Sequence, residues 1–151
     1  MSDLFDLTGK VAIVTGSSLG IGRATAEAMA VHGAKVVISS RKADKCEIVA
    51  EGINQNGGEA MVISCHCSHK DQLQHLVDKP LDAWGRIDVL VCNAAVNPFY
   101  GSLSEIPDDA YDKIMDTNVK SNVWLTSMVI PQMIKLGGGS IIIVSMSLIH
   151  I

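Results

Sequence analysis

Three glycines, Gly16, Gly20 and Gly22, occur within seven residues directly after an apolar run. Glycine lacks a side chain, so it allows backbone amides to come close to another group. Where such a turn follows a strand and opens a helix, its amides and the positive helix N-terminus favour a phosphate. The glycines could instead serve only a sharp turn, but the strand–turn–helix setting favours phosphate contact at all three positions.

A second candidate position follows the next apolar run, where the chain reads Ser40-Arg41. An acidic residue there would accept hydrogen bonds from the ribose 2′-hydroxyl of NAD and would repel a 2′-phosphate. Serine removes that repulsion, and a guanidinium can pair with a phosphate through two parallel hydrogen bonds. Arg41 could instead be an ordinary solvated charge at the start of a helix. The missing acid favours NADP over NAD as the cofactor.

A third candidate is the stretch that contains Cys65, His66, Cys67 and His69. Thiolates and imidazoles bind zinc, but a structural zinc site normally takes paired ligands from two separate stretches. The sequence offers no second pair. We therefore expect no metal here and interpret the stretch as the sulfur-rich end of a strand.

The elements that must position these residues are strands and helices in alternation. The apolar runs are rich in β-branched residues and do not alternate with polar ones, as in strands that are covered on both faces; they span residues 10–15, 34–40, 59–65, 87–94 and 139–145. Helical segments lie between them, at 21–32, 42–56, 69–84 and 108–135. This order predicts right-handed βαβ units and an α/β fold with a doubly wound parallel sheet of the Rossmann type, with about five strands.

Two features of the helical segments carry their own predictions. The segment 108–135 has a stripe at three- and four-residue steps that should face the sheet, made of Tyr111, Ile114, Asn118, Asn122, Leu125 and Val129. The amides of the two asparagines in that stripe would need hydrogen-bond partners. Pro80 lacks an amide hydrogen and should kink or split the helix at 69–84.

Length and composition limit the other possibilities. The 151 residues suffice for one domain, spanning 1–151. A net charge of −4 disfavours a nucleic-acid partner. The N-terminus does not resemble a signal peptide and no apolar run nears the roughly 18 residues that cross a membrane. With its scattered cysteines, including Cys46 and Cys92, the chain is expected to be cytoplasmic, with free thiols and no membrane association.

Several motifs in their order resemble the short-chain dehydrogenase/reductase family, classical type. Residues 15–22 match its TGxxxGxG pattern, "VCNAA" at 91–95 resembles its NNAG stretch, and "DTNVKS" at 116–121 resembles its helical asparagine motif. The segment 83–99 is similar to the NADP-dependent carbonyl and retinal reductase branch. The resemblance implies NADP, with NAD less favoured, bound by Thr15, Gly16, Ser18, Leu19, Gly20, Ile21, Gly22, Ser40, Arg41, His66, Cys67, Asn93, Ala94 and Ala95. His66 and Cys67 replace an Asp-Val pair whose aspartate contacts the adenine in relatives. Asn93 could also be only a turn residue.

The resemblance also implies hydride transfer between a nicotinamide and a small carbonyl or alcohol substrate. Asn118 takes the place of the family's catalytic asparagine, which also braces helix to sheet. Ser147 matches the active serine only with a one-residue shift, since Met146 falls at that position. No tyrosine is followed four residues later by lysine, the pair that moves the proton in the family. We therefore interpret the chain as a family member truncated after the fifth strand, with impaired activity and a possible homo-oligomeric state. The alternative is a non-catalytic nucleotide-binding or interaction module.

Overall fold

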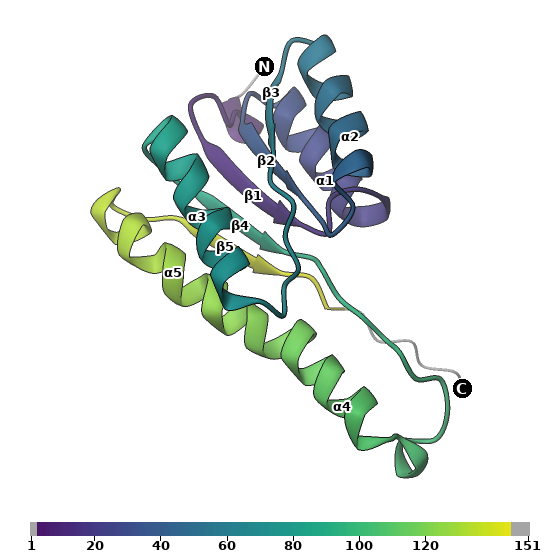
Figure 1. The fold of residues 1–151 in the computed structure, drawn as a ribbon. Helices are drawn as coiled ribbons and strands as arrows, with labels where there is room; N and C mark the ends of the chain where they lie inside the picture. Colours follow the sequence, from purple (N-terminus) through teal and green to yellow (C-terminus); the bar gives the residue numbers. More distant parts are fainter. Residues whose placement is uncertain (1–2, 146–151) are drawn as a thin grey trace.

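A computed structural model describes residues 3–145 and contains one sheet in which every strand is parallel to its neighbours (Figure 1). The strand order is β3-β2-β1-β4-β5, with bounds β1 Val11–Thr15, β2 Lys35–Ser39, β3 Glu59–Val62, β4 Val89–Cys92 and β5 Ser140–Ile143. The predicted α/β class and five-strand parallel sheet are confirmed. Each strand is shorter than its apolar run, because a strand ends where its neighbour stops pairing. After β3, for example, regular pairing gives way to two separate hydrogen bonds. The Ile63 amide donates to the Ile38 carbonyl, and the Cys65 amide donates to the Ser40 carbonyl.

Helices cover both faces of this sheet (Figure 1). Their bounds are α1 Gly20–Val31, α2 Ala43–Gln55, α3 Lys70–Trp84, α4 Asp108–Met115 and α5 Ser121–Lys135, with a π-helical turn η3 at Asp116–Lys120 and short 3-10 turns η1 at Asp3–Phe5 and η2 at Leu103–Glu105. The first two helices lie on one face, and α3 and α5 lie on the other. In the part of the chain that the structure describes, no helix is both long and apolar enough to cross a membrane.

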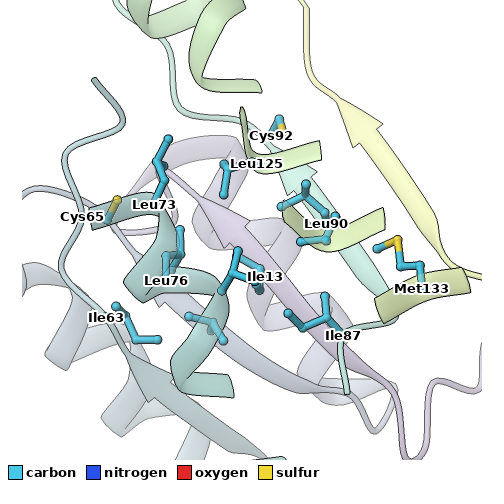
Figure 2. Close-up of a cluster of buried hydrophobic side chains, with 13 residues drawn as sticks. Ile13, Ile63, Cys65, Leu73, Leu76, Ile87, Leu90, Cys92, Leu125 and Met133 are labelled. Carbon is cyan, nitrogen blue, oxygen red and sulfur yellow. The ribbon is translucent and has the colours of Figure 1, made fainter. Parts of the chain in front are cut away.

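Burial on both faces explains why the strands do not alternate. All five residues of β1 are buried. Ile13 points to the α3 and α5 face, where it packs in a cluster with Leu73 and Leu125 (Figure 2). Its neighbours Ala12 and Val14 join the second cluster, under α1 and α2. Each large apolar side chain buried in this way contributes roughly 1.5–3 kcal/mol.

Asp88 aligns the start of β1 with β4 at the opposite end from the strands' carboxyl termini. Its carboxylate accepts hydrogen bonds from the Val11 amide at 2.9 Å and from Arg86 at 2.8 and 2.6 Å. Burial alone would raise the pKa of Asp88, but the Arg86 and Val11 hydrogen bonds outweigh it, so the pKa is lowered. The group therefore holds a charge that stabilises this corner of the sheet.

The predicted stripe on the last helical segment is right in its second half and wrong at its start. Asn122, Leu125 and Val129 are buried, whereas Tyr111 is 49% exposed. α4 extends beyond the carboxyl ends of the strands, so it does not pack on a face of the sheet (Figure 1). The π-helical turn between α4 and α5 also changes which residues share a face.

The split predicted at Pro80 does not occur. α3 continues from Lys70 to Trp84, so the helix is not split. The proline removes a single amide donor, and its buried ring adds to the packing against the sheet. α3 ends instead at Gly85, which has φ of 72° and donates to the Leu81 carbonyl at 2.8 Å.

Candidate cofactor-binding site

A cleft of about 430 Å³ lies at the carboxyl ends of the strands. β2 and β3 lie on one side of β1, and β4 and β5 lie on the other, so the order in which strands are added reverses between β1 and β4. Open parallel sheets leave a crevice for ligands at such a point. The loops after β1 to β4 line it together with the start of α1, with α4 and with η3. The lining residues are Gly16, Ser18, Leu19, Gly20, Ile21, Ser40, Arg41, Lys42, Cys65, His66, Cys67, Asn93, Ala94, Ala95, Val96, Lys113 and Thr117. All the residues predicted to bind cofactor line this cleft except Thr15 and Gly22. Whether they contact a cofactor stays a prediction.

The three glycines after β1 are required for different physical reasons. A Cβ on Gly22 would lie 2.5 Å from the Gly16 carbonyl oxygen, and a Cβ on Gly16 would lie 3.0 Å from the Ala94 Cα. These two glycines therefore allow the turn to pack against itself and against the loop after β4. Gly20 has φ of 58°, and no atom lies within 4 Å of the place where its Cβ would stand. Its backbone is open to the cleft.

Thr15 and Asn93 join this turn to the loop after β4. The Asn93 side-chain amide donates to the Thr15 and Gly16 carbonyls at 2.9 and 3.2 Å. In return, the Thr15 hydroxyl accepts from the Asn93 and Ala94 amides, both at 3.0 Å. Thr15 is thus a buried support of the cleft wall, and its contact with a cofactor stays a prediction.

Ser17 is a second support, and the sequence reasoning missed it. Its hydroxyl donates to the Val14 carbonyl at 2.7 Å and accepts from the Ser39 amide at 2.8 Å. The turn after β1 is thereby fixed to the end of β2. A serine directly after the first glycine was the available signal, but its burial depends on β2, which lies elsewhere in the sequence.

The N-terminus of α1 faces this turn without a side-chain cap. Leu19 is the N-cap residue, and no side chain hydrogen-bonds to the first amides of the helix. The first turn also holds no acidic residue. Such amides are donors for an anion, and the helix dipole adds partial positive charge.

Basic residues dominate the charge of the cleft. Arg41, Lys42 and Lys113 line it, and no aspartate or glutamate does among the described residues. Within residues 3–145, none of these three cations forms an ion pair with a carboxylate. The cleft is therefore positive in a chain whose net charge is −4. Sequence reasoning missed Lys42 and Lys113; Lys113 joins the site only because α4 passes beside the strand ends.

Ser40 shapes the loop that carries Arg41. Its hydroxyl accepts from the Lys42 amide at 3.1 Å and lies 3.1 Å from the Cys46 sulfur. These contacts fix the turn that opens α2 and hold the residues after β2 at the cleft.

The stretch around His66 follows β3, the neighbour of β2, and also lines the cleft. The His66 amide donates to Gln72 at 2.7 Å, and its Nδ1 accepts from the Ser68 amide at 3.3 Å. Burial lowers the pKa of His66, and the nearby charges of His69, Arg41 and Lys113 lower it further. With Nδ1 accepting, the neutral ring carries its proton on Nε2. In the described part of the chain, no group of three or more His, Cys, Asp or Glu side chains is arranged to hold a metal ion.

Asn118 sits in the π-helical turn and braces the loop after β4. Its side chain accepts from the Val96 amide at 2.8 Å and donates to the Val96 carbonyl at 2.9 Å. The Asn122 side chain in turn donates to the Asn118 carbonyl at 2.8 Å, so both amides have the partners that burial requires. Asn118 does not line the cleft, but Val96 does. The other predicted catalytic residue, Ser147, lies outside the described residues.

A model of the short chain dehydrogenase family matches residues 10–148. The dehydrogenase/reductase SDR family member 4 of Bos taurus is 43% identical over 139 residues, which are 92% of this chain and 50% of that protein. The tropinone reductase-like 3 of Erythroxylum coca is 40% identical, over 91% of this chain and 52% of its own length.

Solved structures agree with this relationship. A hydroxysteroid dehydrogenase from Escherichia coli superposes with a TM-score of 0.89 at 35% identity, covering 95% of this chain and 60% of that one. A metagenomic short-chain oxidoreductase in complex with NADP superposes with a TM-score of 0.89 at 37% identity, covering 97% of this chain and 65% of that one. A 7α-hydroxysteroid dehydrogenase complexed with NADH superposes with a TM-score of 0.91 at 34% identity, covering 96% of this chain and 56% of that one.

The chain spans about half the length of the curated relatives it matches. Over that half, the family match, the sequence identities and the fold agree with the motifs at residues 15–22 and 91–95. The chain therefore belongs to the short-chain dehydrogenase/reductase family of oxidoreductases.

Proposed function

We propose that the cleft binds NADP and that the chain supplies the cofactor-binding half of an NADP-dependent oxidoreductase. The observation that carries this proposal is the charge of the cleft: three cations line it and no described carboxylate does. An NAD site would favour an acid after β2. The relatives' cofactors do not decide the question, since one solved structure holds NADP and another NADH.

The residues present fit such a cofactor. The open backbone at Gly20 and the uncapped first turn of α1 would hold the pyrophosphate. Arg41, with Lys42 beside it, would hold the 2′-phosphate, since a guanidinium can make two parallel hydrogen bonds to a phosphate. His66 and Cys67 would border the adenine. When bound, the nicotinamide would supply or accept a hydride.

For the reaction, we propose exchange of that hydride with a small carbonyl or alcohol compound. The relatives named as reductases and hydroxysteroid dehydrogenases support this substrate class. Asn118 would act by holding Val96, and with it the loop after β4, at the edge of the cleft. Asn118 and Ser147 as catalytic residues remain proposals.

A non-catalytic nucleotide-binding module is the second candidate. One observation favours it: in the part of the cleft that the structure describes, no tyrosine lines the site to donate a proton. Loss of a positioned proton donor typically costs 10²–10⁴-fold in rate. We expect the purified chain to bind NADPH without measurable reduction of a panel of aldehydes and ketones; turnover would rule out the module.

The proposed cofactor is tested by titrating the chain with NADPH and with NADH. Replacing Arg41 removes hydrogen bonds between charged groups, which are worth roughly 1.5–3 kcal/mol. Because Arg41 is exposed, solvent and salt reduce that value. We expect NADPH to bind about tenfold more tightly than NADH, and Arg41→Ala to abolish most of the difference. Lys45→Ala removes the same charge from α2 outside the cleft and should leave the preference intact; equal affinities in the unmodified chain would refute NADP.

We further propose a second copy of this chain as a partner. The outer face of α4, η3 and α5 carries an apolar stripe of exposed side chains, Tyr111, Met115, Val119, Val123, Ile130 and Ile134. An exposed stripe of this length is typical of a helix that packs against another protein. A cytoplasmic location stays a prediction.

A further inference from the structure

Two cysteines, Cys65 and Cys67, lie side by side in the wall of the cleft. Cys65 is 2% exposed and its amide is fixed to the Ser40 carbonyl at 3.1 Å. Cys67 is half-buried and opens to the cleft, in a turn closed by the bond from the His69 amide to the His66 carbonyl at 2.9 Å. Residues two apart are separated by at most about 7 Å between Cα atoms. A disulfide spans roughly 4.4–6.8 Å, so the pair is within reach of one after a small adjustment.

The surroundings make the two thiols different. Interaction with the Cys65 thiol lowers the pKa of Cys67, and the charge of Arg41 lowers it further, together outweighing burial. The same neighbour and burial raise the pKa of Cys65, which therefore stays protonated. Burial raises the pKa of Cys92 to about 11. Only Cys67 combines access from solvent with a nearby cation, the setting in which cysteines react.

We propose that Cys67 is a peroxide-reactive thiol of the cleft and that Cys65 converts it to a disulfide. The Cys67 thiolate attacks one oxygen of hydrogen peroxide, the O–O bond breaks, and the departing hydroxide takes a proton to become water. Cys67 is then a sulfenic acid. The Cys65 sulfur attacks the Cys67 sulfur, the S–S bond forms, and the S–O bond breaks with release of water that includes the Cys65 proton. Two thiols are oxidised and one peroxide is reduced.

This chemistry is tested on the reduced, purified chain treated with equimolar hydrogen peroxide. Free thiols are then blocked with N-ethylmaleimide and the peptides are identified by mass. We expect one peptide that contains both Cys65 and Cys67 to lose two hydrogens, while Cys46 and Cys92 remain blocked thiols. Because the experiment measures the mass of a peptide, its result does not depend on nucleotide binding. The absence of the disulfide would therefore leave the proposed NADP site untouched, and the absence of NADP binding would leave the proposed disulfide untouched.

Variants then assign the roles. Cys67→Ser should slow peroxide-dependent thiol loss at least about tenfold. Cys65→Ser should leave a Cys67 sulfenic acid that dimedone traps, and Cys46→Ser should behave as the unmodified chain. If Cys65→Ser does not fold, the order of N-ethylmaleimide labelling in the unmodified chain decides, with Cys67 expected first. A link through Cys46 or Cys92, or earlier labelling of either, would overturn the proposal.

Discussion

Substituting Gly22 by alanine adds a single methyl group at the tightest point of the turn after β1. The new Cβ would lie 2.5 Å from the Gly16 carbonyl oxygen and 2.9 Å from its carbonyl carbon. Both are backbone atoms, so no side-chain rotation relieves the overlap. The turn must move, and with it the Asn93 hydrogen bonds to the Thr15 and Gly16 carbonyls. Overpacking of this kind typically costs 1–3 kcal/mol.

We expect Gly22→Ala to lower the free energy of unfolding by about 1–3 kcal/mol and to weaken NADPH binding about tenfold. Urea denaturation and NADPH titration measure the two effects. Gly52→Ala is the matched control, because Gly52 lies in α2 with nothing within 4 Å of its added Cβ. That control should be neutral or more stable by up to about 1 kcal/mol. If Gly22→Ala has the same free energy of unfolding and the same NADPH affinity as the unmodified chain, the turn is not closely packed at Gly22.

Two further predictions concern stability and association. Asp88→Asn should destabilise the chain by about 1–3 kcal/mol at pH 7, since it removes the charge that Arg86 and Val11 stabilise. Because the folded pKa of Asp88 is lowered, its contribution is present above the unfolded pKa of about 3.9 and disappears as pH falls through the folded pKa; urea denaturation at several pH values should show the two chains converging in acid, and a constant gap would contradict this. Val123→Glu should shift the chain toward monomer in light scattering, because Val123 is 59% exposed in the middle of the stripe on α4 and α5. Ile48→Glu, 63% exposed on α2, should not change the mass, and equal masses for all three chains would argue against pairing through the stripe.

The order of strands and helices could be predicted because its causes are local. β-branched runs, glycines at helix ends and the three-residue spacing between Gly16 and Gly20 are all visible within short windows of sequence. The strand ends could not be predicted, since they depend on pairing. β3 shows this: only Glu59 to Val62 pair in register with β2, although the apolar run continues to Cys65.

The candidate site was predictable where neighbours in sequence are neighbours in the cleft. The supporting role of Thr15 could not be predicted, because its hydroxyl turns toward the loop after β4, which only the folded sheet brings beside it. Lys113 was missed for the same reason, since α4 reaches the cleft from more than ninety residues along the chain from Gly16. Tyr111 was assigned to the buried stripe because periodicity does not reveal where a sheet ends.

A crystal structure of the chain with NADP would show directly whether the cleft holds the cofactor and whether Arg41 binds its 2′-phosphate. We expect a pyrophosphate at the turn formed by residues 16–21 and a 2′-phosphate within hydrogen-bond distance of the Arg41 guanidinium. The molecule also has a groove of about 250 Å³ between α1 and α2, lined by Arg23, Glu27 and Asn56 among others. Nucleotide bound in that groove, or bound in the cleft with its 2′-phosphate turned away from Arg41, would contradict the proposed NADP site.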